Sequence, residues 1–128
     1  KKYNMERVIS FETAQLIPSD YDGESVAAYT KEGYIYPKSY LYSMQPGESF
    51  PCVRYDTLVA WLRENHGIWV SVVDDYCDGI FISYKVVDYG HSGGIHPGMP
   101  EDYHKPEDYY KVLESGLFKA LEILKNRK

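Results

Sequence analysis

Cysteine is scarce in this sequence, and long apolar runs are missing from it. The two cysteines, Cys52 and Cys77, match no metal-binding motif by their spacing. They suit a reducing compartment better than a disulfide framework, although one bridge between them stays open. No apolar run approaches the roughly 18 residues that a membrane-spanning helix needs. No signal-peptide segment opens the chain, so we expect a cytoplasmic protein; a segment removed before Lys1 stays open.

Basic residues are also in deficit, since 14 Lys and Arg face 19 Asp and Glu, for a net charge of −5. A negative chain repels phosphate groups. We therefore expect neither nucleic acid nor an anionic membrane as a partner. The basic residues Lys125, Arg127 and Lys128 are interpreted as charges that complement the C-terminal end of a helix.

Tyrosine is the residue in excess, with 14 among the 128 residues. Tyrosine combines an apolar ring with a hydroxyl that needs a partner. The excess favours cross-strand aromatic pairs in a small sheet, and the alternative is a recognition surface. The length fits a single domain, 1–128, that buries a core without disulfide or metal, and we expect no cofactor.

Three segments carry the signals of helices. The segment 10–17 begins with a serine N-cap and ends before a proline. The segment 54–66 has an apolar stripe, and Gly67 after it can adopt the left-handed conformation that ends a helix. The segment 106–128 begins with proline at its first helical position. Gly116 interrupts its apolar stripe, which predicts close packing against a neighbour.

Two segments read as β-hairpins. In the first, "VAAYTKEGYIYP", the loop 31–33 ends in a glycine that suits a left-handed position. In the second, 68–89, the loop 77–79 has the same form. Pairing Tyr76 with Ile80 predicts one apolar face and one mixed face. The apolar face would hold Ile68, Val70, Val72, Ile80, Ile82, Tyr84 and Val86, and the mixed face Trp69, Ser71, Val73, Phe81, Ser83, Lys85 and Val87.

The remaining segments are weaker. A further short strand is expected around Tyr40–Met44, followed by a Pro-Gly turn. The segment Gly90–Lys105 is rich in glycine, proline and histidine and lacks periodicity, so we expect a loop. Together these elements predict an α+β fold, in which two antiparallel β-hairpins pack with three helices that form a single layer on an antiparallel sheet.

Four stretches of the chain resemble, in their residues and in their order, the sequences of a known group of proteins. These stretches are "FETAQLI", "AAYTKEGYIY", "LVAWLRENHGIWVSV" and "YYKVLESGLFKALEIL". They resemble a group of small uncharacterised proteins from gut Bacteroidetes and their phages or mobile elements. The resemblance implies a bacterial or phage cytoplasmic protein and supports the order of the elements. It implies no activity, cofactor or catalytic residue, and it does not include Gly90–Lys105.

A Gly-x-Ser-x-Gly pattern centred on Ser92 matches the motif of the turn that carries the nucleophilic serine in many hydrolases. Such a turn joins a strand to a helix within a parallel sheet. Here a strand precedes the pattern, but Pro97 and Gly98 interrupt any helix after it. We interpret the segment as a loop, and hydrolysis by Ser92 is the alternative.

Three histidines, His91, His96 and His104, lie in the same segment, close to Asp88, Glu101 and Asp102. Imidazole and carboxylate groups are the ligands that zinc and similar ions take. The spacing across two glycines has no fixed geometry, so we interpret these histidines as exposed. A metal site on this segment is the alternative.

Four tyrosines, Tyr34, Tyr36, Tyr40 and Tyr42, alternate in two short runs, and alternation places each pair on one face of a strand. We expect helices to cover that face; if it is bare, the four form a binding surface. No convergent nucleophile, base and oxyanion donors are recognisable. The sequence therefore favours a non-enzymatic module for an unidentified protein partner or for self-association.

Overall fold

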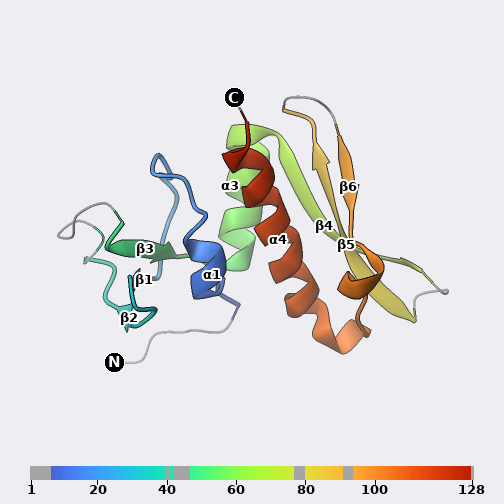
Figure 1. The fold of residues 1–128 in the computed structure, drawn as a ribbon, viewed down its shortest axis with the longest axis horizontal. Coiled ribbons are helices and arrows are strands. Elements are labelled where there is room, and N and C mark those ends of the chain that lie inside the picture. Colours follow the sequence, from blue (N-terminus) through green and yellow to red (C-terminus); the bar gives the residue numbers. More distant parts are fainter. Residues whose placement is uncertain (1–6, 40, 42–46, 77–79, 91–93, 128) are drawn as a thin grey trace. The chain divides into compact units, whose positions relative to one another are not determined.

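A computed structural model shows an α+β protein with two three-stranded antiparallel sheets, which confirms the predicted fold class (Figure 1). The described residues also contain three α-helices. No helix among them is long and apolar enough to cross a membrane. The chain divides into two compact units, 1–58 and 59–128. The structure describes residues 7–39, 41, 47–76, 80–90 and 94–127, without the side chains of Asp75 and Tyr76.

The first unit contains a short helix and a small sheet with the strand order β2-β1-β3. The predicted first hairpin is confirmed, because β1 pairs antiparallel with β2 and Gly33 has a positive φ of 90°. A Cβ at Gly33 would lie 3.2 Å from the Phe11 ring, so a side chain there would meet both strain and a close contact. The elements are α1 (Phe11–Ala14), β1 (Ala27–Thr30), β2 (Ile35–Tyr36) and β3 (Ser49–Cys52).

Two details of this unit differ from expectation. The helix α1 is shorter than predicted, because the bonds from Leu16 to Thr13 and from Ile17 to Ala14 have the tighter i→i+3 pattern before Pro18. The strand β3 was not predicted, since it contains Pro51, which cannot donate to a ladder. It is an edge strand, where a proline is tolerated. The strand expected at Tyr40–Met44 falls almost entirely outside the described residues.

Three aromatic rings pack against one another in the first unit. The Phe11 ring lies 5.7 Å from that of Tyr29 and 6.0 Å from that of Phe50. The Tyr29 hydroxyl donates a 2.7 Å hydrogen bond to the carbonyl of Ile9, so its buried polar group is satisfied. Cys52 is buried nearby, and burial raises the pKa of its thiol. Cys52 is therefore part of the core.

The middle helix, α3 (Tyr55–His66), ends where predicted. Gly67 has a φ of 66° and its N–H donates to the carbonyl of Arg63, so the glycine ends the helix in the left-handed conformation. The strand β4 (Ile68–Tyr76) follows at once. The boundary between the two units falls within α3.

The second unit is a sheet with the order β4-β5-β6 and one long helix along its face (Figure 1). Its other elements are β5 (Phe81–Asp88), β6 (Ile95–Pro97) and α4 (Tyr109–Lys125). The predicted pairs Val70–Val86 and Val72–Tyr84 are confirmed. Near the hairpin tip the register shifts, so that Tyr76 pairs with Phe81. The expectation that Ile80 belongs to the apolar face was wrong, since its side chain is 61% exposed.

The helix α4 packs on β4 and β5, over the apolar face predicted for them. Leu117 and Leu121 of the helix are fully buried. The predicted close approach at Gly116 is confirmed, because a Cβ there would lie 3.0 Å from both the Tyr84 Cβ and the Val70 Cγ1. The glycine lets the helix approach the sheet to this distance. One face of the sheet is thus covered by a single helix.

The interpretation of Gly90–Lys105 as a loop was partly wrong. Three of its residues form β6, which pairs with β5. Two short 3₁₀ turns follow, η2 (Pro100–Asp102) and η3 (Pro106–Asp108), of which the second leads into α4. Between the two turns His104 forms a β-bridge with Ile82. Period-2 alternation cannot be recognised over only three residues, which is why β6 was missed.

Candidate functional site

The predicted loop site is only partly described by the structure. Ser92 and His91 lie outside the described residues, so the hydrolase interpretation stays a prediction. His96 pairs with Val86, and His104 bridges to Ile82. Four residues of β5 separate these positions, a distance of about 13 Å along the strand. Among the described residues no three His, Cys, Asp or Glu side chains form a group that could hold a metal.

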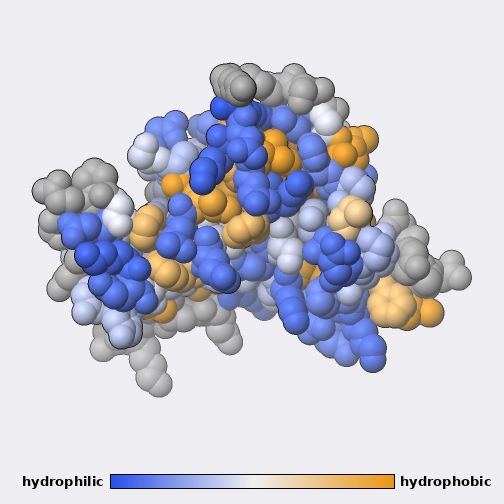
Figure 2. Space-filling view, viewed as in Figure 1, coloured by the Kyte–Doolittle hydropathy of each residue, from blue (hydrophilic) through white to orange (hydrophobic). Residues whose placement is uncertain are grey.

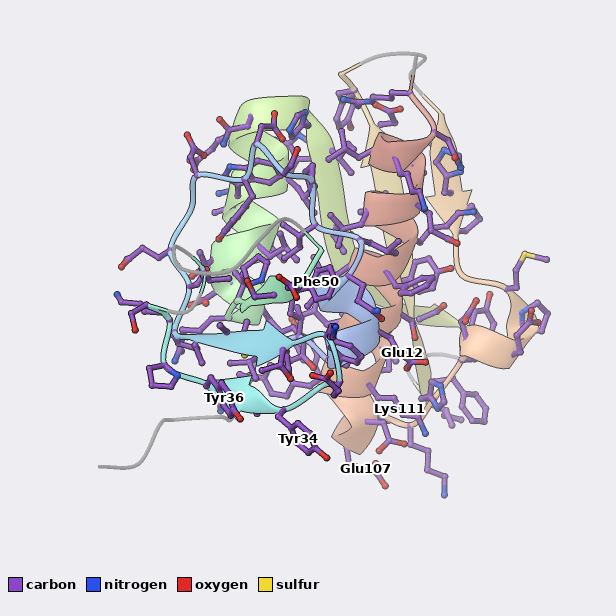
Figure 3. All side chains as sticks on the ribbon, turned by 60° about the vertical axis from the view of Figure 1, so that its left-hand side comes forward. Glu12, Tyr34, Tyr36, Phe50, Glu107 and Lys111 are labelled. Carbon is purple, nitrogen blue, oxygen red and sulfur yellow. The ribbon has the colours of Figure 1, made fainter. Side chains whose placement is uncertain are left out.

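The predicted tyrosine surface is exposed where it is described. The side chains of Tyr34 and Tyr36 are 65% and 40% exposed, so the expectation that helices cover them was wrong. Figure 3 shows both tyrosines at the outer edge of the small sheet, whereas Phe50 lies beside α1. Tyr40 and Tyr42 lie outside the described residues. The described half of the predicted surface is therefore available for contacts.

A second exposed aromatic group lies on the other sheet, on the face opposite α4. There Trp69 pairs with Val87 and Val87 pairs with Ile95, which makes one row across all three strands. The side chains of Trp69 and Ile95 are 49% and 65% exposed, and that of neighbouring Tyr89 is 69% exposed. We call Trp69, Val87, Tyr89 and Ile95 the Trp69 surface.

Two neighbours hold the Trp69 ring in place. The ring of Tyr89 meets it edge to face, with 6.2 Å between centroids. The guanidinium carbon of Arg63, from α3, lies 5.4 Å from the ring centroid, a cation–π contact. The tryptophan is therefore supported by one strand and one helix while half of its side chain stays exposed.

Glycines bring the two aromatic side chains together. The Tyr89 N–H donates a 2.9 Å hydrogen bond to the carbonyl of Gly67, two residues before Trp69. A Cβ on Gly67 would lie 2.8 Å from the Cα of Gly90, and a Cβ on Gly90 would overlap the carbonyl oxygen of His66. Only glycine allows the two backbone segments to approach this closely. The start of β4 and the end of β5 are thereby fixed against each other.

A buried ion pair supports the same corner. Asp88 is 3% exposed, and its Oδ1 accepts a hydrogen bond of 2.6 Å from Arg127 and one of 3.1 Å from the Gly90 N–H. The same Arg127 nitrogen donates to the carbonyl of His66 at 3.0 Å. The guanidinium therefore links the segment after α4 to the end of α3 and the end of β5.

Neither partner of this ion pair was identified from the sequence, which interpreted Arg127 as one of the charges that complement the C-terminal end of a helix. A signal was nevertheless present. Asp88 follows Tyr84 and Val86 in the same alternation, so the predicted register places a carboxylate on the apolar face. A buried carboxylate needs a cation or hydrogen-bond donors. Arg127 supplies both.

Two cations lie on and beside the Trp69 surface. Lys85 of β5 belongs to the row next to Trp69 and Val87, and its side chain is exposed. Arg63 is also partly exposed and forms a 3.5 Å ion pair with Glu64. Figure 2 shows one face of the molecule, on which hydrophilic residues predominate and hydrophobic ones form small groups between them.

Trp, Tyr and Arg are the residue types that most often dominate the binding energy of protein interfaces. The Trp69 surface and Arg63 combine all three on a rigid sheet. The chain matches no protein-family model, and no curated protein or solved structure is similar enough to it to count as a match. The geometry of this surface is thus the observation on which a functional proposal can rest.

Proposed function

We propose that this protein is a non-enzymatic interaction module that binds a partner protein through the Trp69 surface. The observation that carries the proposal is the apolar row Trp69–Val87–Ile95 with Tyr89 beside it, in which Trp69, Tyr89 and Ile95 are exposed. An exposed tryptophan held in one orientation loses little conformational entropy when it is buried by a partner.

The support beneath the surface is consistent with this role. Binding residues act best when packing and hydrogen bonds lock them before the partner arrives. Here the Asp88–Arg127 ion pair and the Gly67–Gly90 contact fix the backbone on both sides of the aromatic pair. A buried ion pair in this position favours the interpretation that the surface keeps one defined conformation for binding.

The proposal includes the expectations that follow from the sequence resemblance. The partner would be met in the cytoplasm of a bacterium of the resembling group or of its phage. There the protein would serve as an accessory module without a cofactor. The exposed residues Tyr34 and Tyr36 form a second, smaller surface for the same kind of role.

The test is selection of a random phage-displayed peptide library on the immobilised wild-type protein. Peptides that also bind the double variant Trp69→Ser/Tyr89→Ser are removed by counterselection. We expect enriched peptides whose affinity falls at least ~30-fold in the variant, the loss typical of a hot-spot residue. The far-UV circular dichroism of the variant should be unchanged, because both side chains are exposed.

Two matched variants complete the design. Ile80→Ser removes an equally exposed apolar side chain from the hairpin tip of the same sheet and should leave peptide binding intact. Tyr34→Ser/Tyr36→Ser tests the second surface. If the enriched peptides bind the Trp69 variant as well as the wild type, the Trp69 surface is not the binding site. If only the tyrosine variant loses binding, the tyrosines at β2 form the binding site in place of the Trp69 surface.

A further inference from the structure

We infer that the partner of the Trp69 surface is an acidic protein segment, in which an apolar side chain is flanked by Asp or Glu residues. The inference rests on the proposed function and adds the chemistry of the partner. Its basis is charge complementarity. The chain carries a net charge of −5, yet two cations, Lys85 and Arg63, lie on and beside this surface.

Lys85 is the first of these cations. It belongs to the row next to Trp69–Val87–Ile95, paired with Ser71 on one side and Pro97 on the other. All three side chains of its row are exposed. An apolar partner side chain lying over Val87 would therefore place its neighbouring residues beside the Lys85 ammonium group.

Arg63 is the second cation, and its position makes it available to a partner. Its guanidinium lies over the Trp69 ring, so a group that contacts the ring also meets the charge. Its ion pair with Glu64 joins adjacent residues with partly exposed side chains. Such pairs contribute little to stability. A carboxylate of the partner can therefore share or replace Glu64 at small cost.

A second copy of this chain fits the surface less well. Face-to-face pairing of two copies about a two-fold axis brings the same patch of both copies together. Lys85 and Arg63 would then face a patch that carries the same two cations, and two chains of net charge −5 would approach each other. Like charges across an interface oppose association. An acidic segment from another protein meets neither obstacle.

The test uses the peptides selected above and two charge reversals that change the net charge equally. Lys85→Glu lies on the Trp69 face, whereas Lys111→Glu lies on α4, which covers the opposite face (Figure 3). We expect the Trp69-dependent peptides to be rich in Asp and Glu. Lys85→Glu should lower the affinity for these peptides about fivefold, and Lys111→Glu should lower it by less than about twofold, because charges at the rim of an interface act over short distances.

A measurement without a ligand tests the same charge. Trp61 is 7% exposed and Trp69 49%, so collisional quenchers in solution report mainly on Trp69. Iodide should quench its fluorescence more effectively than caesium does. At low ionic strength Lys85→Glu should lower the iodide quenching constant about twofold, whereas Lys111→Glu should leave it unchanged.

The outcomes separate the inference from the function on which it rests. If the Trp69-dependent peptides are neutral or basic, or if Lys85→Glu does not change their affinity, the inference of an acidic partner is overturned. The proposal that the Trp69 surface binds a partner would still stand. A dimer in light scattering that Trp69→Ser dissociates would identify a second copy as the occupant and overturn the inference as well. If no peptide depends on Trp69, both proposals fail.

Discussion

Replacing Arg127 with Met should destabilise the second unit by about 3 kcal/mol, although the residue stands in what reads as a basic tail. The guanidinium nitrogen lies 2.6 Å from the Asp88 carboxylate, and the two side chains are only 15% and 4% exposed. Exposed ion pairs contribute at most about 1 kcal/mol. Removing one partner of a buried pair costs roughly 3–5 kcal/mol, because the other charge remains buried without compensation.

The lower end of that range applies here for two reasons. The Gly90 N–H continues to donate to Asp88 in the variant, so the carboxylate keeps one hydrogen bond. The Arg127 side chain also retains some exposure, and water can enter where it was. The carbonyl of His66 loses its bond to the guanidinium, which adds a smaller cost of about 1 kcal/mol.

A double-mutant cycle measures the pair itself. Arg127→Met, Asp88→Asn and the double variant are compared with the wild type by urea unfolding, and Asn keeps an acceptor for the Gly90 N–H. We expect the double variant to be about 2 kcal/mol more stable than the sum of the single effects. Hydrogen exchange at the Tyr89 amide, which donates to Gly67, should accelerate in Arg127→Met. A coupling energy below about 0.5 kcal/mol would refute the reasoning.

Two further predictions concern titration and chemistry. Burial and the nearby Asp102 carboxylate raise the pKa of the Tyr84 phenol above its ordinary value of 10.0, so folding favours the protonated form. The free energy of unfolding should be unaffected by this group below pH 10 and fall above it, and Tyr84→Phe should reduce that slope in urea titrations. A non-enzymatic module also predicts that a serine-reactive fluorophosphonate probe labels wild type and Ser92→Ala equally; labelling lost only in the variant would establish a nucleophile.

The elements that could be predicted from the sequence are those with a strong local signal. Gly33 and Gly67 mark a turn and a helix end, because both positions have the positive φ that glycine tolerates best. The register of β4 and β5 followed from alternation over nine and eight residues. The strands β3 and β6 escaped prediction because they are short and contain proline.

Exposure of the Trp69 surface depends on packing that alternation does not describe. Both faces of the β4–β5 hairpin carry apolar residues, Val70 and Val86 on one and Trp69 and Val87 on the other. The helix α4 covers the face with Val70 and Val86, because Gly116 lets the helix approach that face closely. The strands indicate which face the helix covers, because Ser71, Ser83 and Lys85 make the second face mixed, but alternation does not show how much of that mixed face stays exposed.

The ion pair that supports the Trp69 surface could have been predicted from the sequence more readily than the exposure of that surface. Asp88 lies in register with Val86, on the face that α4 covers, and a carboxylate there requires a cation. The cation had to come from an element that reaches the end of β5. Arg127, after the last turn of α4, is such a residue, and its bond to Asp88 places Tyr89 beside Trp69. A charged residue on a predicted apolar face therefore locates the corner of the fold that supports the proposed binding surface.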